Sequence, residues 1–154
     1  MSDFSVRDAT REDILEIVRF NAAMARETED LDLEPIKLKE GVQAVFEDPL
    51  KGFYLVVEHA GKARACLMIT TEWSDWRNGH FWWIQSVYVE KEYRNQGLFK
   101  ALYRYLLDRV ESNSAIAGLR LYVEKENILA QQTYEKLGMH KTDYFLYEYS
   151  KTKV

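Results

Sequence analysis

The stretch from Ser86 to Leu107 constrains this chain most, because it reads as a strand that passes into a helix through a short basic turn. The β-branched residues stop at Val89, and an apolar stripe at helical spacing begins at Leu98. Arg94 and Gly97 lie in the turn between them. The first amides of a helix have no partner within the helix, and the helix dipole adds positive potential there. We therefore expect the turn to bind an anion such as a phosphate or a diphosphate.

The residues of this turn exclude two common phosphate-binding motifs. The chain has neither the G-x-x-x-x-G-K-[ST] of a P-loop nor the three glycines of a dinucleotide fingerprint. The run Arg94-Asn95-Gln96-Gly97-Leu98-Phe99 instead resembles the R-x-x-G-x-G/A signature of the GNAT superfamily of N-acetyltransferases, which hold the pyrophosphate of acetyl-CoA in this way. Phe99 stands where that family usually has glycine or alanine. Either the start of the helix tilts to make room for the ring, or the ring packs under the turn.

A second stretch strengthens the resemblance. The segment from Glu124 to Met139 is similar to the GNAT pattern N-x-x-A-x-x-x-Y-x-x-x-G-F/M. Asn127, Ala130, Tyr134 and Gly138 all match it. Together the two motifs cover residues 81–141 in the expected order, and two such units in tandem are more specific than either alone.

The resemblance implies an α/β fold with a central mixed sheet of about seven strands flanked by about four helices, in one domain over residues 1–154. It implies acetyl-CoA as the co-substrate, held by the strand end, the turn and the two helix starts. The cofactor-binding residues that it implies are Val87, Tyr88, Val89, Arg94, Asn95, Gln96, Gly97, Leu98, Phe99, Lys100, Asn127, Ala130 and Tyr134.

Two of these residues also have ordinary structural interpretations. Asn127 is a common N-cap residue, and Tyr134 could simply bury its ring in the core. The resemblance implies instead that Asn127 bonds the pantetheine amides and that Tyr134 points its hydroxyl at the sulfur of CoA. A donor at that position would stabilise or protonate the leaving thiolate, as general acid catalysis requires.

An amine must lose a proton before it attacks a thioester, so a base is expected directly or through water. The resemblance puts the acceptor site near the end of the first helix, which favours Glu27 and Glu29 as catalytic residues. Each carboxylate could equally be a solvated surface charge. The other candidates are Asp30, Glu72, Asp75 and a water bound near Gln85 and Ser86.

The composition of the chain restricts the kinds of molecule that it is expected to bind. The net charge of −4 argues against a nucleic-acid partner, and no apolar run is long enough to span a membrane. The polar N-terminus lacks a signal-peptide core, and the single cysteine, Cys66, reads as a buried thiol. We therefore expect a cytoplasmic protein. His59, His80 and His140 show no metal-ligand spacing, and no G-x-S-x-G nucleophile motif is present.

The apolar patterns predict the element order β-α-α-β-β-β-α-β-α-β, with a loop at Trp73–Gly79. Within it, Trp73–Arg77 is either a substrate lid or simple hairpin packing. Trp82 and Trp83 should face opposite sides of their strand. The expected strands are 4–8, 53–58, 63–71, 81–89, 119–124, 139–141 and 144–149, and later helices are expected at about 37–46, 98–112 and 128–137.

These features predict an N-acetyltransferase that moves the acetyl group of acetyl-CoA directly to a primary amine of a small molecule, such as an amino acid derivative or a polyamine. A protein or peptide amine is the alternative acceptor, and a non-catalytic acyl-CoA-binding sensor is the alternative from another class. The aromatic segment Tyr144–Tyr149 could pair across a homodimer.

Overall fold

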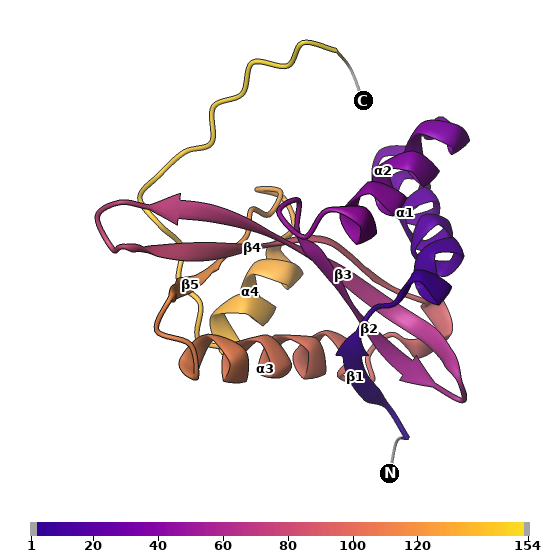
Figure 1. Cartoon of the computed structure of the whole chain (residues 1–154), viewed down its shortest axis with the longest axis horizontal. Helices are drawn as coiled ribbons and strands as arrows, with labels where there is room; N and C mark the ends of the chain where they lie inside the picture. The colour runs from indigo at the N-terminus through magenta and orange to yellow at the C-terminus, as the bar shows by residue number, and fades with distance from the viewer. Residues whose placement is uncertain (1–2, 153–154) are drawn as a thin grey trace. The chain divides into compact units, whose positions relative to one another are not determined.

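The computed structural model describes residues 3–152, which form two compact units, one up to Leu121 and one from Tyr122 (Figure 1). Residues 1–2 and 153–154 of the expected domain lie outside the described part. The first unit contains, in chain order, β1 (Ser5–Asp8), η1 (Arg11–Asp13), α1 (Ile14–Glu29), α2 (Pro35–Glu47), β2 (Phe53–His59), β3 (Lys62–Ser74), β4 (Gly79–Val89), η2 (Lys91–Tyr93), α3 (Leu98–Glu111) and β5 (Ile116–Arg120). The second unit contains α4 (Ile128–Lys136) and an extended segment after it.

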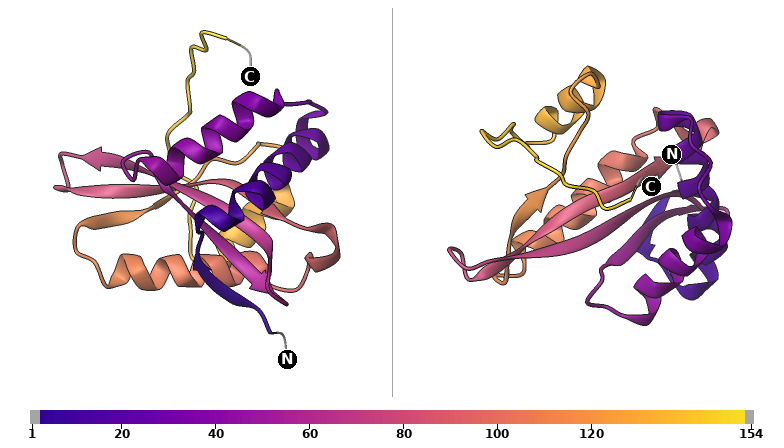
Figure 2. Two further views of the ribbon diagram at one scale, coloured as in Figure 1. Left: turned by 45° about the vertical axis from the view of Figure 1, so that its right-hand side comes forward. Right: turned by 90° about the horizontal axis from the view of Figure 1, so that it is seen from above.

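The first unit is a mixed α/β fold, as the sequence predicts. Its sheet has the order β1-β2-β3-β4-β5, in which neighbours are antiparallel except for the parallel pair β4 and β5. Parallel strands need a crossover, and α3 supplies it. Figure 2 shows α1 and α2 on one side of this sheet and α3 on the other.

Local capping fixes the start of η1, which runs directly into α1, and the start of α2. The Thr10 amide donates to Asp13 at 2.8 Å in a capping box, and the guanidinium of Arg7 holds the same carboxylate. Pro35 opens α2, and the Glu34 carboxylate accepts from two amides of its first turn. Helix α1 continues through Glu29, and residues 30–34 connect it to α2.

Alternation along the strands divides the core between the two faces of the sheet. Val56 and Cys66 pack with Ile17 and Phe20 of α1 in one cluster. The opposite face of the sheet meets α3, where Leu102 and Leu106 are fully buried. Burial raises the pKa of the Cys66 thiol to about 12, so the interpretation of this residue as a buried thiol is confirmed.

The paired tryptophans of β4 face opposite sides, which confirms the alternation expected from the sequence. The buried Trp82 ring meets Phe53 edge-on at 5.3 Å and lies beneath the guanidinium of Arg109 on α3. The Trp83 indole instead donates to Glu72 of β3 at 3.2 Å.

The prediction of a loop over Trp73–Gly79 is wrong. Strand β3 continues through Trp73, and β4 begins at Gly79, so the connecting turn is only residues 75–78. Regular pairing extends this far because Trp73 lies opposite His80, and their rings meet at 4.9 Å.

The strands of the last third also differ from expectation. Strand β5 begins at Ile116 and contains Gly118, where the sequence suggests a strand from 119 to 124. A Cβ at Gly118 would lie 3.1 Å from the ring of Phe81 on β4, so glycine allows the ring to approach this strand. The described residues form five strands rather than about seven, because 139–141 and 144–149 do not form strands there.

Gly52 and Gly41 provide a matched test of this fold. At Gly52, φ is +139°, and an added Cβ would lie 2.1 Å from the Ile69 carbonyl oxygen. We expect Gly52→Ala to lower the free energy of unfolding by about 3 kcal/mol or more. Gly41 lies inside α2 with no atom near its Cβ position, so Gly41→Ala should raise the free energy of unfolding by about 0.5–1 kcal/mol. Urea unfolding followed by tryptophan fluorescence measures both, and equal effects of the two variants would contradict the packing described here.

Candidate functional site

The end of β4 carries a β-bulge. Tyr88 pairs with Cys66 and Gln85 pairs with Met68, so two residues of β4 oppose one of β3. Ser86 in the bulge has φ of 53°, in the left-handed region. A bulge re-aims the side chains that follow it, and such bulges are common beside active sites. Here it directs Tyr88 toward α1, where its ring lies 5.5 Å from that of Phe20.

Beyond the bulge, β4 has a strand neighbour on one side only. The parallel ladder with β5 ends where Trp83 pairs with Arg120. Within the first unit, residues 84–89 therefore pair with β3 and have no strand on their other edge. Such an edge can accept an extended ligand through main-chain hydrogen bonds, as an added strand does.

This edge leads directly into the predicted anion turn. Asn95 and Gly97 have positive φ values of 63° and 81°, and Gly97 is the N-cap of α3. The first intrahelical bond runs from the Ala101 amide to the Gly97 carbonyl at 3.0 Å. Gly97 has no side chain to cap the helix, and a Cβ added there would meet nothing within 4 Å. The arrangement is that of a helix N-terminus that can take an anion.

The residues after Gly97 show how the chain accommodates Phe99. Leu98 is buried and anchors the start of α3, whereas Lys100 is exposed. The Phe99 ring is half-buried, and its centroid lies 6.4 Å from that of Tyr103, one turn further along the same helix. The ring therefore packs along α3.

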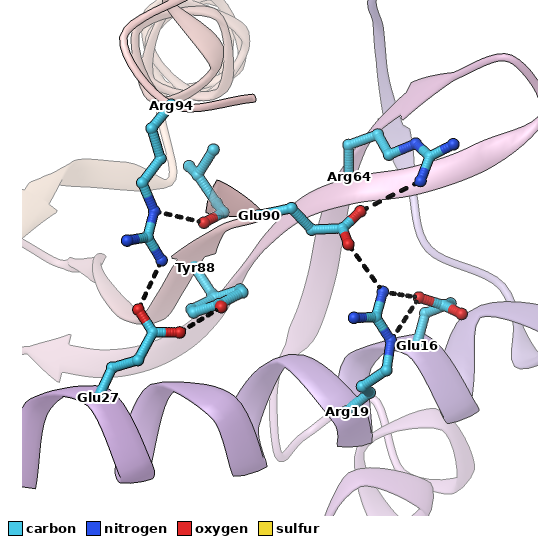
Figure 3. Close-up of polar contacts among 8 residues, drawn as sticks. Glu16, Arg19, Glu27, Arg64, Tyr88, Glu90 and Arg94 are labelled. Carbon is cyan, nitrogen blue, oxygen red and sulfur yellow. Dashed lines mark hydrogen bonds and ion pairs between the residues drawn. The ribbon is translucent and has the colours of Figure 1, made fainter. Parts of the chain in front are cut away.

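Arg94 and Glu27 lie together, although the sequence assigns them to separate roles (Figure 3). The Arg94 guanidinium donates to the Val89 carbonyl at 2.9 Å and to one Glu27 oxygen at 2.8 Å. The Tyr88 hydroxyl donates to the other Glu27 oxygen at 2.5 Å. The cluster joins the end of α1 to the end of β4 and the turn. Glu29 is exposed nearby in sequence and forms no ion pair within residues 3–152.

These contacts set the protonation states of the cluster. The bonds from Tyr88 and Arg94 lower the pKa of the Glu27 carboxyl. Burial, and then the bond to Glu27, raises the pKa of Tyr88 to about 12. A carboxylate with both oxygens engaged and a lowered pKa is a weak base. In this structure the Glu27 carboxylate therefore holds the Arg94 and Tyr88 side chains in place.

A second ionic cluster braces the start of the turn, and sequence reasoning missed it. Glu90 lies just after β4 and accepts from Arg64 at 3.3 Å and from Arg19 of α1 at 3.1 Å (Figure 3). The Arg64 guanidinium also lies 5.0 Å above the ring of Tyr93 in η2. No local motif signals this cluster, because its members come from α1, from β3 and from the end of β4 and become neighbours only in the folded sheet.

Of the remaining base candidates, Asp30 is the C-cap of α1 and pairs with Arg26 at 3.4 Å. The others lie on or beside the β3–β4 hairpin. One oxygen of Glu72 accepts from the Trp83 indole and, at 2.7 Å, from Arg120 of β5. Gln85 donates to Thr70 across the two strands. Asp75 lies in the hairpin turn, at the opposite end of β4 from Arg94, so the structure does not bring it or the Trp73–Arg77 segment to the anion turn (Figure 1).

The second unit positions the other motif residues on α4. The Asn127 side chain accepts from the Ala130 amide at 3.1 Å, which confirms its role as N-cap. Gly138 has φ of 102° and ends the helix, with the Met139 amide donating to the Tyr134 carbonyl at 3.0 Å. Tyr134 is half-buried, and burial raises its pKa, so its hydroxyl keeps its proton as a donor.

The chain belongs to the acetyltransferase (GNAT) family, whose model matches residues 12–139. The chain is 47% identical to a possible acetyltransferase from Clostridium difficile 630, over 97% of this chain and 99% of that one, with a TM-score of 0.91. No curated protein sequence matches it significantly.

Two more distant structures share the fold. They are a ribosomal-protein-alanine N-acetyltransferase from Brucella melitensis biovar Abortus 2308, at 16% identity and a TM-score of 0.77, and a glucosamine-6-phosphate N-acetyltransferase from Arabidopsis thaliana, at 21% and 0.72. The matches cover 96% of this chain in both cases, and 98% and 99% of the other chains. No helix among residues 3–152 combines the length and the apolar character of a membrane span.

The Glu27 cluster makes stability depend on pH. Because the folded state lowers the pKa of Glu27, its contribution to stability is present above the ordinary glutamate pKa of about 4.3 and is lost as the pH falls through the lowered value. Glu27→Gln should therefore destabilise the protein at neutral pH, and the difference from the unmodified protein should shrink on acidification below about pH 4. Urea unfolding at a series of pH values measures this.

Glu29→Gln is the matched control, since Glu29 lies two residues away without an ion pair in the described chain. It should change the unfolding free energy little at any pH. A Glu27→Gln difference that stays constant across the acid range would show that the carboxylate is not held as described.

Proposed function

We propose that this protein is an N-acetyltransferase that moves the acetyl group of acetyl-CoA directly to the primary amine of a small molecule, such as an amino acid derivative or a polyamine. We further propose that its two units form one acetyltransferase domain that acts as a homodimer in the cytoplasm. The family model supports the single domain, because its match runs through both units.

One observation supports the cofactor above all. The unpaired edge of β4, residues 84–89, runs straight into the turn at Gly97 and the N-terminus of α3. Acetyl-CoA has a diphosphate joined to a chain with two amides and a thioester. The diphosphate suits the helix N-terminus, and the amides suit the strand edge. In this proposal the thioester lies beside Val87, Tyr88 and Val89, and a backbone amide there stabilises the oxyanion.

The chemistry of the leaving group gives Tyr134 its proposed role. When the amine attacks the thioester carbon, a tetrahedral intermediate forms, and its collapse breaks the carbon–sulfur bond and releases a thiolate. A hydroxyl with a raised pKa stays protonated at neutral pH and can donate a hydrogen bond to that sulfur. Asn127 and Ala130 would lie beside the pantetheine chain in the same proposal.

The acidic end of α1 and the loop after it support the proposal that the acceptor is an amine. Glu29, Asp30, Asp32 and Glu34 follow one another there, and Arg26 offsets part of the charge through Asp30 and Asp32. A negative rim attracts a cationic amine. Since Glu27 and Glu72 both hold arginines, we assign removal of the amine proton to Glu29 or to a water near Gln85 and Ser86.

Two alternatives remain in competition with the small-molecule acceptor. The distant structural neighbours include enzymes named for a protein amine and for a sugar amine, and at their identities they show the fold alone. The alternatives are separated by release of free thiol from acetyl-CoA across a panel of polyamines, amino acid derivatives and peptides. Release with peptides alone would overturn the proposed acceptor class, and tight CoA binding without release for any amine would overturn turnover itself.

Gly97 and Gly61 allow the cofactor site to be tested with equal backbone strain. Both have positive φ, 81° and 76°, and neither has an atom near its Cβ position. Gly97→Val should weaken CoA binding by about a hundredfold or more, because the branched side chain would occupy the space in front of the α3 amides. Gly61→Val, in the β2–β3 turn, should leave the affinity unchanged. Calorimetric titration with CoA measures both, and equal affinities would place the diphosphate elsewhere.

Tyr134 is tested by removing its hydroxyl while keeping its ring. Tyr134→Phe should lower kcat by about tenfold to a thousandfold while the affinity for CoA changes little, because the hydroxyl acts on the leaving thiolate. Tyr103→Phe, at a buried tyrosine on α3, is the control and should leave kcat unchanged. An unaltered kcat for Tyr134→Phe would remove Tyr134 from this role.

A further inference from the structure

The face of the sheet that carries α1 changes from apolar to polar along β3 and β4. Met68 of β3 still packs against the core cluster beneath α1. Side chains two residues apart on a strand share a face, so Thr70 and Glu72 follow Met68 on this one. The register places Gln85 opposite Met68 and Trp83 opposite Thr70. Thr70, Glu72, Trp83 and Gln85 therefore form a polar patch within the first unit.

The hydrogen bonds of the polar patch leave two acceptor oxygens open. The side-chain amide of Gln85 donates to the Thr70 hydroxyl, which fixes the orientation of the amide. No residue among 3–152 donates to the carbonyl oxygen of that amide, and this oxygen is not buried away from solvent. The Trp83 indole and the Arg120 guanidinium donate to the same oxygen of Glu72, at 3.2 and 2.7 Å. Within the described residues, the second oxygen of Glu72 accepts no hydrogen bond.

The cations beside the polar patch are already engaged. Arg120 pairs with Glu72, and its guanidinium carbon lies 3.6 Å from the ring centroid of Phe81. Arg77 lies 4.9 Å from the same centroid and donates to the Ser74 hydroxyl. A carboxylate on the acceptor would have to draw a guanidinium out of these contacts. An ammonium group can instead use the open oxygens directly, since it carries only donors.

We propose that the polar patch binds the far end of a polyamine acceptor, and specifically of a triamine. This inference rests on the proposed function, in which the thioester lies beside Val87–Val89 and the amine reacts on the α1 side of β4. A strand advances about 3.3 Å per residue, so Trp83 lies about 10 Å along β4 from Ser86 in the bulge. An acceptor that reaches both places is therefore long and carries charge away from its reacting amine.

The triamine has a separate task for each nitrogen. The reacting amine loses its proton and takes the acetyl group, and CoA leaves as the free thiol. The middle ammonium group donates to the open oxygen of Gln85. The far ammonium group donates to the open oxygen of Glu72 and stays charged throughout.

The first test compares four amines in the release of free thiol from acetyl-CoA. Spermidine spans the required length and carries additional ammonium groups. Octylamine has a similar length without a second charge, aminooctanoate ends in a carboxylate, and diaminopropane is too short. Spermidine should have a kcat/KM at least about tenfold above each of the others. A kcat/KM for any other amine that equals or exceeds the spermidine value would overturn the proposal.

The second test removes the charge of Glu72. Glu72→Gln should raise the KM for spermidine by about tenfold or more, because the variant loses the carboxylate and leaves Arg120 uncompensated. The kcat for spermidine and the KM for octylamine should change little, since Glu72 contacts only the far ammonium group. Glu58→Gln is the matched control, because Glu58 also pairs with an arginine, Arg7 at 2.9 Å, but lies on β2 outside the patch. It should leave the KM for spermidine unchanged.

Calorimetric titration of spermidine into the protein saturated with CoA separates this inference from the proposed function. Spermidine should bind, and Glu72→Gln and Gln85→Met should each weaken the binding by about tenfold. Such binding without thiol release for any amine would support the polyamine site and overturn turnover. Thiol release with octylamine, together with no binding of spermidine, would keep the transferase and overturn the site. Spermidine binding that neither variant weakens would also overturn it.

Discussion

The structure depends on how the backbone of β4 meets its hydrogen-bonding requirements. Every buried amide and carbonyl needs a partner, and in a sheet that partner is usually the next strand. Strand β4 has β3 along its whole length but β5 only as far as Trp83. Within the first unit, the remaining residues, up to Val89, have no strand on their second edge, so its backbone groups can pair with an extended ligand. The bulge at Ser86 lies in this half of the strand and directs Tyr88 toward α1. A sheet that stayed paired throughout would have no such edge.

Two ionic clusters hold this half of β4 against its surroundings. Glu27 brings Arg94 and Tyr88 together, and Glu90 brings Arg19 and Arg64 together (Figure 3). Each cluster joins α1 to the strand ends beside the turn. Exposed ion pairs contribute little on their own, but these carboxylates are partly shielded and each accepts from two donors. The helix that borders the proposed acceptor site is thereby fixed to the turn that borders the cofactor.

The sequence predicted the parts of this fold that have strong local signals. The N-cap interpretation of Asn127 is confirmed, because the signal is a hydrogen bond to a residue close in the chain. The apolar patterns likewise located α2, α3 and α4 to within a few residues. The ends of the strands were harder to predict from the sequence, because pairing with the neighbouring strand decides them and the residues' own strand propensity does not. Trp73 joins β3 only because His80 lies opposite, and Gly118 reads as a strand boundary until the Phe81 ring is seen beside it. The last two expected segments, 139–141 and 144–149, do not form strands within the described residues.

The candidate site also has a part that the sequence could predict and a part that it could not. Gly97 and Arg94 were identified from the turn alone, whereas no spacing in the sequence joins Arg94 to Glu27, 67 residues earlier. The pairing of Glu72 with Trp83 and Arg120 likewise requires the register of three strands. Side chains that meet across the sheet are specified by the fold, and a one-residue shift in register would separate them.

The occupied state of Arg94 has a consequence for ligand discrimination. Any anion that draws this guanidinium toward the turn must displace a carboxylate that already holds it at 2.8 Å. A singly charged ion competes poorly in that exchange, whereas a multiply charged group that also takes the α3 amides can win it. The displaced Glu27 would keep only Tyr88 as a donor, and its proton affinity would rise. Occupation of the turn would thus alter the charge balance at the far end of α1 before any second molecule arrives.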